Sequence, residues 1–493
     1  MQPDFDMTVI GGGAAGLVAA GISASLGART ALIESNRLGG DCTWTGCVPS
    51  KALLKSAHMA HAARASAEYG ITREEPQINF AAVMRRVDSV RRGIYEQADS
   101  PEVFERLGVR VFTARARFTD AHTVQLSTGQ RVTSRYFLIA AGSRPLIPKL
   151  EGLDAVPHFT SDSIFEIDRL PARLIVVGAG PQGVELAQAF QRLGSKVTVI
   201  ESSHRVLGRD DAELTYLLEQ SLRKEGIDFR FGTTVERIEG NVTAHLNGGT
   251  RLEADAILFA AGRYVDVSDL DLRAAGIRVT EYGVRVDDRC RTDVRHIYAA
   301  GDVTGRHQFT HMAEHMAKVA VFNALAGKLV ARKVRLEETR VPWCTYCDPE
   351  LAHVGASEDQ LRNREIRYEA FKFPYARLDR AIVDGEETGL IKVFAAPNGK
   401  ILGATILGAR AGELIGEWAL ALRHGMQLAD ITATLHPYPS YAFGNRRVAD
   451  QRLLSRRSPA LLWGLKLFRG LRGRVPAGAR FGEEVPQDQQ SRD

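Results

Sequence analysis

The chain has 493 residues, of which 44% are hydrophobic and 25% charged, a composition typical of a globular protein with room for about three domains of roughly 100–200 residues. The formal net charge of +5 is small for this length, so the body of the chain lacks the basic surface of a nucleic-acid-binding protein. No signal peptide is recognisable, and no stretch reaches the about 18 uninterrupted apolar residues of a membrane-spanning helix. We therefore expect a cytoplasmic protein whose five cysteines do not form a structural disulfide framework.

The first predicted element is an apolar strand that ends in a G-x-G-x-x-G turn and leads into an alanine-rich helix. In Met7–Gly16 (MTVIGGGAAG), Gly11 permits the tight turn and Gly13 lets the backbone approach a pyrophosphate. Gly16 allows the helix to pack closely on the strand. Glu34 ends the following strand, where a carboxylate would bond ribose hydroxyls. The glycine turn alone is a weak signal, but together these features predict a bound dinucleotide.

The next segment, Gly39–Lys51 (GGDCTWTGCVPSK), places Cys42 and Cys47 five residues apart across a glycine-containing turn, at a predicted helix start. This spacing can close a small disulfide loop. A thiolate at a helix N-terminus has a lowered pKa, which lets such a pair cycle between dithiol and disulfide near neutral pH. From the residues alone, two buried reduced cysteines remain the alternative.

The strand, glycine turn and helix pattern recurs once in LIVVGAGPQG, with glycines at the equivalent places: Gly178, Gly180 and Gly183. Glu201 closes the next strand, so a second dinucleotide is predicted. A carboxylate there favours NADH because it repels a ribose phosphate, although His204 and Arg205 nearby would accommodate one.

Between and after the two units, the pattern predicts helices to about Arg106 and then strands ending at Phe137–Ser143 (FLIAAGS), a pattern repeated at Ile257–Arg263 (ILFAAGR). Alternating strands with turn signals follow over residues 341–408, and then a helix over Ala411–His424. This predicts a separate C-terminal domain. We expect the last dozen residues, which are polar, to be disordered.

Taken together, these motifs resemble the class I pyridine nucleotide-disulfide oxidoreductases, the family of dihydrolipoamide dehydrogenase and mercuric reductase. The resemblance spans about residues 5–455 and includes Ala299–Thr304 (AAGDVT), whose Asp302 resembles the family's acid on the FAD ribityl chain. It implies an α/β fold with two Rossmann-like dinucleotide-binding domains, for FAD and NAD(P), plus a C-terminal α+β dimerisation domain. The expected segments are residues 1–148 and 271–337 for FAD, 149–270 for NAD(P), 338–455 for dimerisation, and 456–493 as a basic tail that is partly disordered.

The resemblance also implies roles for single residues. Cys47 resembles the thiol nearer the flavin, which forms the charge-transfer contact, and Cys42 resembles the interchange thiol that meets the substrate. Lys51 resembles the lysine beside flavin N5, paired with Glu185. The expected cofactors are FAD and NAD(P)H, with NADH preferred. Their expected contacts are Gly11, Gly13, Ala14, Ala15, Gly16, Glu34, Ser35, Gly40, Asp41, Lys51, Ala141, Gly142, Gly178, Gly180, Gln182, Gly183, Glu201, Gly262, Gly301, Asp302 and His311.

The family's catalytic base is a histidine in the pattern His-Pro-x-x-x-Glu, supplied across a dimer interface. Here His436 is present, but Tyr441 stands where the orienting glutamate is expected. A phenol can accept a hydrogen bond from the imidazole but brings no negative charge, which argues against lipoamide as the substrate. Tyr438 resembles the mercuric reductase tyrosine that assists the metal ion.

Three further features are expected to be secondary. His307, His311 and His315 would share one face of a helix, but no resident metal site is expected. Cys344 and Cys347 would lie on one strand and face opposite sides, and like Cys290 they are assigned no function. The segment over residues 452–474 alternates leucines and aromatics with basic residues, so it would lie either on an anionic membrane surface or against the dimer.

The sequence thus predicts a homodimeric, FAD-dependent NAD(P)H:disulfide oxidoreductase. Electrons are expected to reach the Cys42–Cys47 disulfide and then a small-molecule disulfide or a thiol-bound metal ion, as in mercuric reductase, with no nucleic-acid partner. The alternatives are an NAD-dependent dihydrolipoamide dehydrogenase and a redox-sensing flavoprotein without small-molecule turnover.

Overall fold

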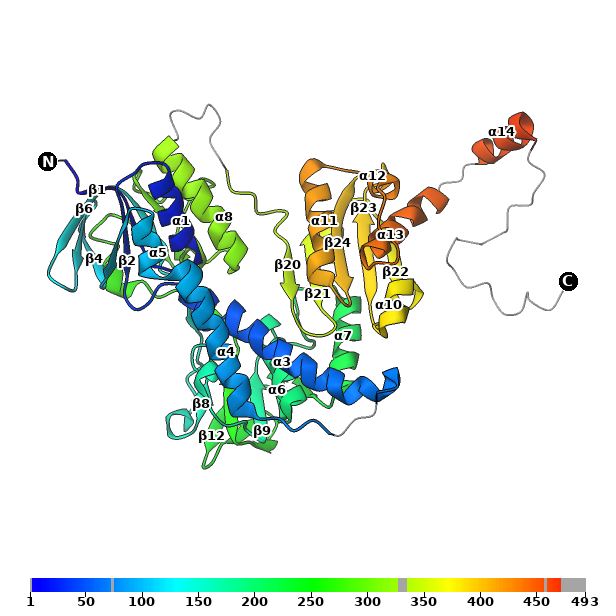
Figure 1. Cartoon of the computed structure of the whole chain (residues 1–493), viewed down its shortest axis with the longest axis horizontal. Coiled ribbons are helices and arrows are strands. Elements are labelled where there is room, and N and C mark those ends of the chain that lie inside the picture. Colours follow the sequence, from blue (N-terminus) through cyan, green and yellow to red (C-terminus); the bar gives the residue numbers. More distant parts are fainter. Residues whose placement is uncertain (1, 72–74, 327–334, 456–458, 471–493) are drawn as a thin grey trace. The chain divides into compact units, whose positions relative to one another are not determined.

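A computed structural model describes residues 2–71, 75–326, 335–455 and 459–470. The chain forms two compact units, Met1–Val206 with Arg223–Glu337, and Leu207–Leu222 with Glu338–Asp493 (Figure 1). The first unit contains two largely parallel sheets and the second contains one antiparallel sheet, so the predicted α/β fold is confirmed. The predictions for the last dozen residues lie outside the described residues.

The first sheet of the first unit has seven strands, in the order β3-β2-β1-β6-β5-β4, with β19 beside β6. The strands are β1 (Phe5–Ile10), β2 (Thr30–Glu34), β3 (Val109–Thr113), β4 (Ala116–Asp120), β5 (Thr123–Leu126), β6 (Arg131–Ile139) and β19 (Ile297–Ala299). Strands β3, β2, β1, β6 and β19 pair in parallel, and apolar runs fill their buried centre. The helices α1 (Ala14–Ser25) and α8 (Thr310–Val321) lie side by side next to this sheet (Figure 1).

The second sheet repeats the parallel arrangement, in the order β11-β10-β9-β15-β8. Its strands are β8 (His158–Phe159), β9 (Arg173–Val177), β10 (Lys196–Glu201), β11 (Asp228–Phe231) and β15 (Ala256–Phe259). Helix α6 (Pro181–Leu193) follows β9. Three small antiparallel sheets complete the part of the first unit that the structure describes. One has three strands, β12 (Val235–Glu239), β13 (Thr243–Leu246) and β14 (Arg251–Glu253). The other two are strand pairs, β7 (Arg144–Pro145) with β16 (Arg263–Tyr264) and β17 (Val279–Thr280) with β18 (Gly283–Val284).

Four helices follow β2 in the chain: α2 (Gly40–Trp44), α3 (Cys47–Ala65), α4 (Phe80–Ile94) and α5 (Pro101–Arg106). Helix α3 packs against both α4 and α6. The segment Gly39–Lys51, which contains Cys42 and Cys47 and is called the redox segment below, therefore lies between the first glycine turn and α6, the helix that follows the second glycine turn.

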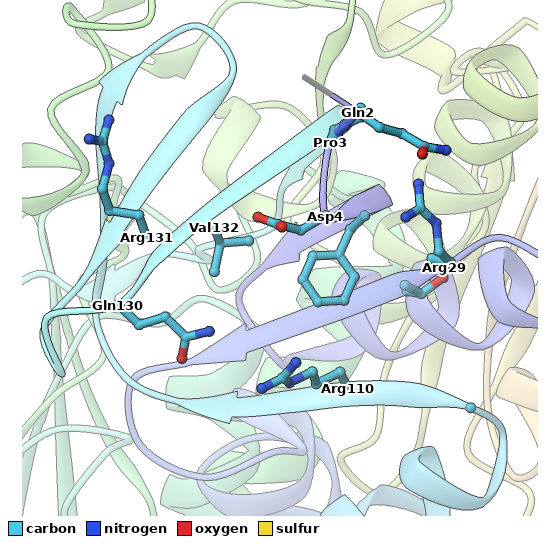
Figure 2. Close-up of a pocket in the computed structure, with 11 residues that line it drawn as sticks. Gln2, Pro3, Asp4, Arg29, Arg110, Gln130, Arg131 and Val132 are labelled. Carbon is cyan, nitrogen blue, oxygen red and sulfur yellow. The ribbon is translucent and has the colours of Figure 1, made fainter.

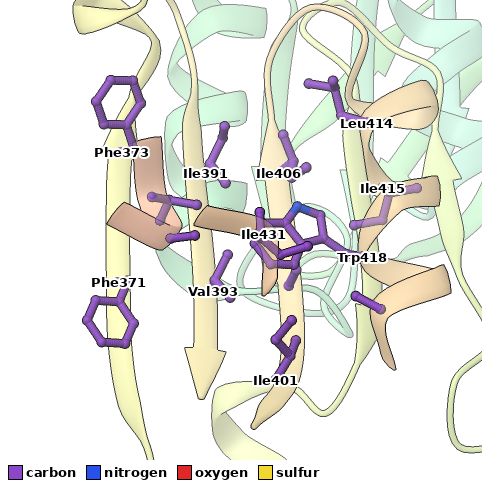
Figure 3. Close-up of a cluster of buried hydrophobic side chains, with 14 of the residues drawn as sticks. Phe371, Phe373, Ile391, Val393, Ile401, Ile406, Leu414, Ile415, Trp418 and Ile431 are labelled. Atoms are coloured by element: carbon purple, nitrogen blue, oxygen red, sulfur yellow. The ribbon is translucent and has the colours of Figure 1, made fainter. Parts of the chain in front are cut away.

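The second unit is built on a five-stranded antiparallel sheet in the order β20-β21-β24-β23-β22. Its strands are β20 (Trp343–Thr345), β21 (Leu351–Gly355), β22 (Glu369–Pro374), β23 (Leu390–Ala395) and β24 (Ile401–Leu407). Its helices are α9 (Glu358–Asn363), α10 (Asp379–Asp384), α11 (Ala411–His424), α12 (Leu428–Ala433), α13 (Ala442–Ser455) and α14 (Pro459–Arg469), with most of α7 (Ala212–Lys224). Figure 3 shows Trp418 of α11 buried against Ile406 and Ile431.

The structure confirms the predicted helix Ala411–His424 to the residue and corrects two local predictions. Helix α8 begins at Thr310, so His307 lies before it and does not share a helical face with His311. Strand β20 ends at Thr345, so Cys344 lies on the strand while Cys347 is buried in the turn that follows. Among the described residues, no helix combines the length and the apolar character needed to cross a membrane.

Candidate active site

The first glycine turn leaves room for a ligand at one of its three glycines. A Cβ added at Gly11 would overlap the carbonyl oxygen of Ala140, and one added at Gly16 would overlap that of Gly11. At Gly13, by contrast, the nearest atom to an added Cβ is the Cα of Gly40, at an ordinary 3.8 Å. The first two glycines are therefore required by the protein's own packing, whereas Gly13 keeps the N-terminus of α1 open to an anion.

Glu34 is fixed at the end of β2 by the same turn. Its carboxylate accepts the N–H of Gly12 at 2.7 Å and the N–H of Asn36 at 2.8 Å, and the Ser35 hydroxyl donates to it at 3.2 Å. The carboxylate therefore stays beside the glycine turn, at the carboxyl end of a parallel strand where a ribose would lie.

The second glycine turn repeats this geometry. Added Cβ atoms at Gly178 and Gly183 would overlap backbone oxygens, but one added at Gly180 would meet nothing within 4 Å. Glu201 accepts the N–H groups of Ala179 and Ser203, each at 2.7 Å. Burial alone would raise the pKa of Glu201, but these donors outweigh it and hold the pKa below its usual range. Both turns thus fit a dinucleotide, with a charged acid at the second.

Several other expected cofactor contacts share the carboxyl edges of the parallel strands. Ala141 and Gly142 follow β6, Gly262 follows β15, and Gly301 with Asp302 follows β19. Ligands of open α/β sheets bind at this edge. The residues present therefore fit FAD in the first sheet and NAD(P) in the second.

A polar network that the sequence did not predict links this edge to the redox segment. Arg263 donates from Nε to the Ser143 hydroxyl at 2.7 Å and forms an ion pair with Asp41. Ser143 in turn donates to Asp302 at 2.7 Å. Burial raises the pKa of Asp41 to about 6, in spite of the neighbouring guanidinium. In the sequence, Arg263 is only the last residue of the repeated pattern Ile257–Arg263, and nothing in that pattern indicates that its side chain connects Asp41 with Ser143.

The redox segment lies directly against the first glycine turn. Gly40 has a positive φ of 55°, and an added Cβ there would lie 2.6 Å from the Cα of Gly13. Cys42 is part of α2, and Cys47 is the first residue of α3. Both cysteines are free thiols in the structure. The sequence prediction that Cys47 begins a helix is therefore correct.

The two thiols are electrostatically unequal. A hydrogen bond from the Cys42 thiol is the main cause that lowers the pKa of Cys47 to about 6. Thr310 and Lys51 lower it further, and together the three groups outweigh the opposing effect of burial. The same hydrogen bond, together with burial, raises the pKa of Cys42. Thr310, whose Oγ1 lies 3.4 Å from the Cys47 sulfur, was not anticipated from the sequence. Near neutral pH, the dithiol therefore holds one thiolate, on Cys47, and one thiol, on Cys42.

Lys51 and Glu185 form the ion pair that the family resemblance implied. The Lys51 ammonium lies 2.7 Å from the Glu185 carboxylate, and the two residues come from the packed helices α3 and α6. The glutamate side chain is 5% exposed, so its charge is held in one position. The lysine side chain is 38% exposed.

His311 is the second residue of α8, and its ring stacks on that of Phe309, with ring centroids 5.4 Å apart. Within the described residues, no group of three or more His, Cys, Asp or Glu side chains is arranged to hold a metal ion. Cys347 lies 3.2 Å from the carbonyl oxygen of Pro349 and is 1% exposed.

The C-terminal residues expected in the site lie in the second unit. The Tyr438 phenol is exposed and donates to Asp379 at 2.9 Å. Tyr441 donates to Asp384 at 3.0 Å. Tyr441, which stands in the position of the family's orienting glutamate, therefore bonds Asp384 and not His436 in this structure. The histidine instead lies 2.8 Å from a carboxylate that the sequence did not single out, Glu417 of α11.

The first unit also contains a polar cavity of about 520 Å³ (Figure 2). It is lined by Asp4, Arg29, Arg110 and Arg131 at the amino ends of β1, β2, β3 and β6. Cofactors of parallel sheets bind at the carboxyl ends, so this cavity is not the predicted site.

Comparison with known proteins agrees with this architecture. Residues 5–317 match the family model described as pyridine nucleotide-disulphide oxidoreductase, and residues 341–446 match the dimerisation domain of the same family. The chain belongs to this family. It is an FAD-dependent pyridine nucleotide-disulfide oxidoreductase that uses NAD(P)H, and its dimerisation domain supports a homodimer.

Relatives within the family carry more than one name. A mercuric reductase from Bacillus cereus is 34% identical over 90% of this chain and 70% of its own length. A dihydrolipoyl dehydrogenase from Geobacillus stearothermophilus is 33% identical over 89% of this chain and 94% of its own length. The structure of the HOCl-induced flavoprotein disulfide reductase RclA from Escherichia coli superimposes with a TM-score of 0.81 at 26% identity, covering 90% and 99% of the two chains. A Cu(II) complex of RclA matches equally well, with a TM-score of 0.81.

Proposed function

We propose that this flavoprotein reduces a disulfide or a thiol-bound metal ion at Cys42, using electrons from NAD(P)H. The observation that carries the proposal is the unequal pair of thiols, in which Cys47 has a pKa of about 6 and the pKa of Cys42 is raised. Such a pair separates a thiolate beside the cofactor from a thiol that meets the acceptor. When bound, FAD supplies the two-electron relay between the nicotinamide and the Cys42–Cys47 disulfide.

The disulfide branch of the proposed reaction needs two exchanges. A base, His436 from the other subunit of the dimer, removes the Cys42 proton, and the thiolate attacks the substrate disulfide. The departing substrate thiolate takes that proton from the histidine. The Cys47 thiolate then attacks the Cys42 sulfur, which restores the intramolecular disulfide and releases the second substrate thiol after protonation from solvent.

For a metal acceptor, both sulfurs bind the ion as thiolates, and the exposed Tyr438 phenol is the additional oxygen donor. The two thiolates give up two electrons, to one mercuric ion or to two cupric ions in turn, and return to the Cys42–Cys47 disulfide. The names of the relatives, mercuric reductases and a Cu(II) complex of RclA, are consistent with this branch. We also propose the domain limits stated above and a preference for NADH, since the charged Glu201 disfavours a ribose phosphate.

The experiment is an anaerobic titration of the purified protein with NADH and then with NADPH, reading the long-wavelength thiolate-to-flavin charge-transfer band. Lipoamide, glutathione disulfide, mercuric ion and cupric ion are then added in turn. The proposal expects the band to appear in the wild type but not in Cys47→Ser, and at least one of these oxidants to discharge it. Bleaching of the flavin without the band would remove the cysteines from the electron path.

A dihydrolipoamide dehydrogenase is the second candidate, favoured by the carboxylate that lies beside His436. It requires rapid reduction of NAD by dihydrolipoamide in the same preparation. A redox sensor requires the opposite result, namely a band that forms but that no acceptor discharges within seconds.

We further propose that α14 contacts an anionic lipid surface. Trp463 and Phe468 are 65% and 80% exposed on a helix that also carries Lys466 and Arg469. Residues 451–482 contain no acidic side chain, so the charge of this segment suits anionic lipids. The protein should sediment with vesicles containing phosphatidylserine but not with phosphatidylcholine alone, and the double variant Trp463→Ser, Phe468→Ser should stay in the supernatant. Equal sedimentation of the variant would refute the contact.

A further inference from the structure

His436 is held inside its own unit by two acceptors. Its side chain is 6% exposed, its Nε2 lies 2.8 Å from Oε1 of Glu417, and its Nδ1 lies 3.1 Å from the carbonyl oxygen of Thr434. Glu417 belongs to α11, far from the His-Pro-x-x-x-Glu pattern in which the family's orienting acid is expected. The sequence pattern lacks a carboxylate beside His436, and in the folded protein Glu417 of α11 supplies one.

Glu417 is itself fixed by a buried hydrogen-bond chain. Its second oxygen, Oε2, accepts from the Asn445 side-chain amide at 2.8 Å. Asn445 is 0% exposed, and its amide oxygen accepts from the Trp418 indole at 2.9 Å. The amide nitrogen also donates to the carbonyl of Leu414 at 3.3 Å. Because Trp418 is locked in the core of the unit (Figure 3), this chain holds the carboxylate towards the imidazole.

We propose that Glu417 is the positioning residue for His436, performing the task for which the sequence offered only Tyr441. The proposal rests on the proposed function, in which His436 is the acid and base for Cys42. Tyr441 is engaged elsewhere, because its hydroxyl donates to Asp384.

The two bonds of the imidazole are not equivalent. A hydrogen bond to a carboxylate is charge-assisted and stronger than one to a neutral carbonyl. As a base, His436 is a neutral imidazole that donates from Nε2 to Glu417, so Nδ1 carries the lone pair and leaves the Thr434 carbonyl to take the proton. The carboxylate also fixes the tautomer and the orientation of the ring, as a carboxylate does beside a catalytic histidine.

The test measures alkylation of Cys42 by iodoacetamide in the NADH-reduced holoenzyme, with the modified peptide quantified by mass spectrometry. This rate needs no physiological acceptor. The pKa of Cys42 is raised, so its alkylation near neutral pH depends on a base. The variants are Glu417→Gln, Glu417→Asp, His436→Gln and the double variant Glu417→Gln, His436→Gln. Glu413→Gln is the matched control, since Glu413 is an exposed acid one turn earlier on the same helix.

The expected result is alkylation about 100-fold slower in His436→Gln and about tenfold slower in Glu417→Gln, with most of the rate restored in Glu417→Asp. The double variant should be no slower than His436→Gln, because Glu417 acts only through the histidine. The Glu413→Gln protein should match the wild type. A role of Glu417 in packing alone would slow the double variant further, which overturns the inference.

Two other outcomes separate this inference from the function on which it rests. If His436→Gln is slow while Glu417→Gln alkylates as fast as Glu413→Gln, the positioning role is refuted and the proposed function stands. If His436→Gln alkylates at the wild-type rate, the histidine is not the base for Cys42, and both the acid–base part of the proposed function and the role of Glu417 are refuted.

Discussion

The redox segment and the C-terminal segment carry the two halves of the proposed chemistry, and they are built differently. In Gly39–Lys51, the group that lowers the pKa of Cys47 most comes from the segment itself, because the Cys42 thiol donates to Cys47, and Lys51 of the same segment adds to the effect. In Leu435–Tyr441, the histidine and the two tyrosines have their side-chain hydrogen-bond partners on helices outside the segment. These partners are Glu417 of α11 for His436, and Asp379 and Asp384 of α10 for Tyr438 and Tyr441.

This difference explains why one motif transferred directly from the family and the other did not. A contiguous motif brings its own neighbours, so its residue spacing already specifies the local geometry. A segment whose partners lie on α10 and α11 can lack a carboxylate in its own sequence, because a side chain of another part of the chain can supply the carboxylate after folding. The absence of a residue from a motif is therefore a weak argument for the absence of its chemical group.

The largest effect is expected in the redox segment, from Cys42→Ser. No intramolecular disulfide can then form, so turnover with any disulfide or metal acceptor should fall by about 1000-fold or more. The Cys47 thiolate should persist without added NADH, since its pKa also depends on Lys51 and Thr310. Steady-state assays and the long-wavelength band of the resting protein check this. Reduction of an artificial dye by NADH should continue, and its loss would point to a folding or FAD-binding defect.

A smaller and more selective effect is expected from Tyr438→Phe in the C-terminal segment. In the proposed reaction, the exposed phenol is an oxygen donor for a metal ion but has no role in disulfide exchange. We expect mercuric or cupric ion reduction to fall by about tenfold, roughly the value of one hydrogen-bonded or liganding contact. Disulfide reduction should change less than about twofold, because the hydrogen bond that is lost joins Tyr438 to Asp379 at the surface and involves neither thiol. An equal fall with both acceptors would mean that the tyrosine supports the fold of the segment.

The thiolate of the redox segment should respond to Thr310→Val. Because the native pKa of Cys47 is depressed to about 6, the thiolate is present above that pH and is lost as the pH falls through it. Removing the Thr310 hydroxyl withdraws a hydrogen bond from the charged form and should raise the pKa by about one unit. The absorbance of the charge-transfer band as a function of pH measures the midpoint. A midpoint unchanged in the valine variant would assign the depression to Cys42 and Lys51 alone.

The sequence predicted the fold and the two glycine turns because local physics determines them. Gly16 and Gly183 are required wherever a helix packs directly on the preceding turn, and no other residue avoids the overlap. Strand-end acids such as Glu34 follow from the same repeat. These features depend on neighbours in sequence, so periodicity and spacing were enough to find them.

The groups that the sequence missed are those that meet only after folding. Thr310 reaches Cys47 from a helix that begins 263 positions later in the chain. Arg263, the first residue of β16, bridges Asp41 and Ser143, and Glu417 reaches His436 from α11. None of these residues stands in a recognisable pattern, because no residue spacing connects each one to its partner.

The smallest effect on the chemistry is expected from Tyr441→Phe, which removes the residue that stands in the family's glutamate position. Its hydroxyl donates to the Asp384 carboxylate, and its ring packs against Tyr375 with centroids 5.9 Å apart. The phenylalanine keeps the ring contact and loses one hydrogen bond to a charged group, so the free energy of unfolding should fall by about 1–2 kcal/mol. Cys42 alkylation should stay within about twofold of the wild type, since Glu417 keeps its hold on His436. Chemical denaturation and the alkylation rate measure the two quantities on the same preparation. A slow alkylation rate with unchanged stability would return the orienting role to position 441 and contradict the comparison of the two segments.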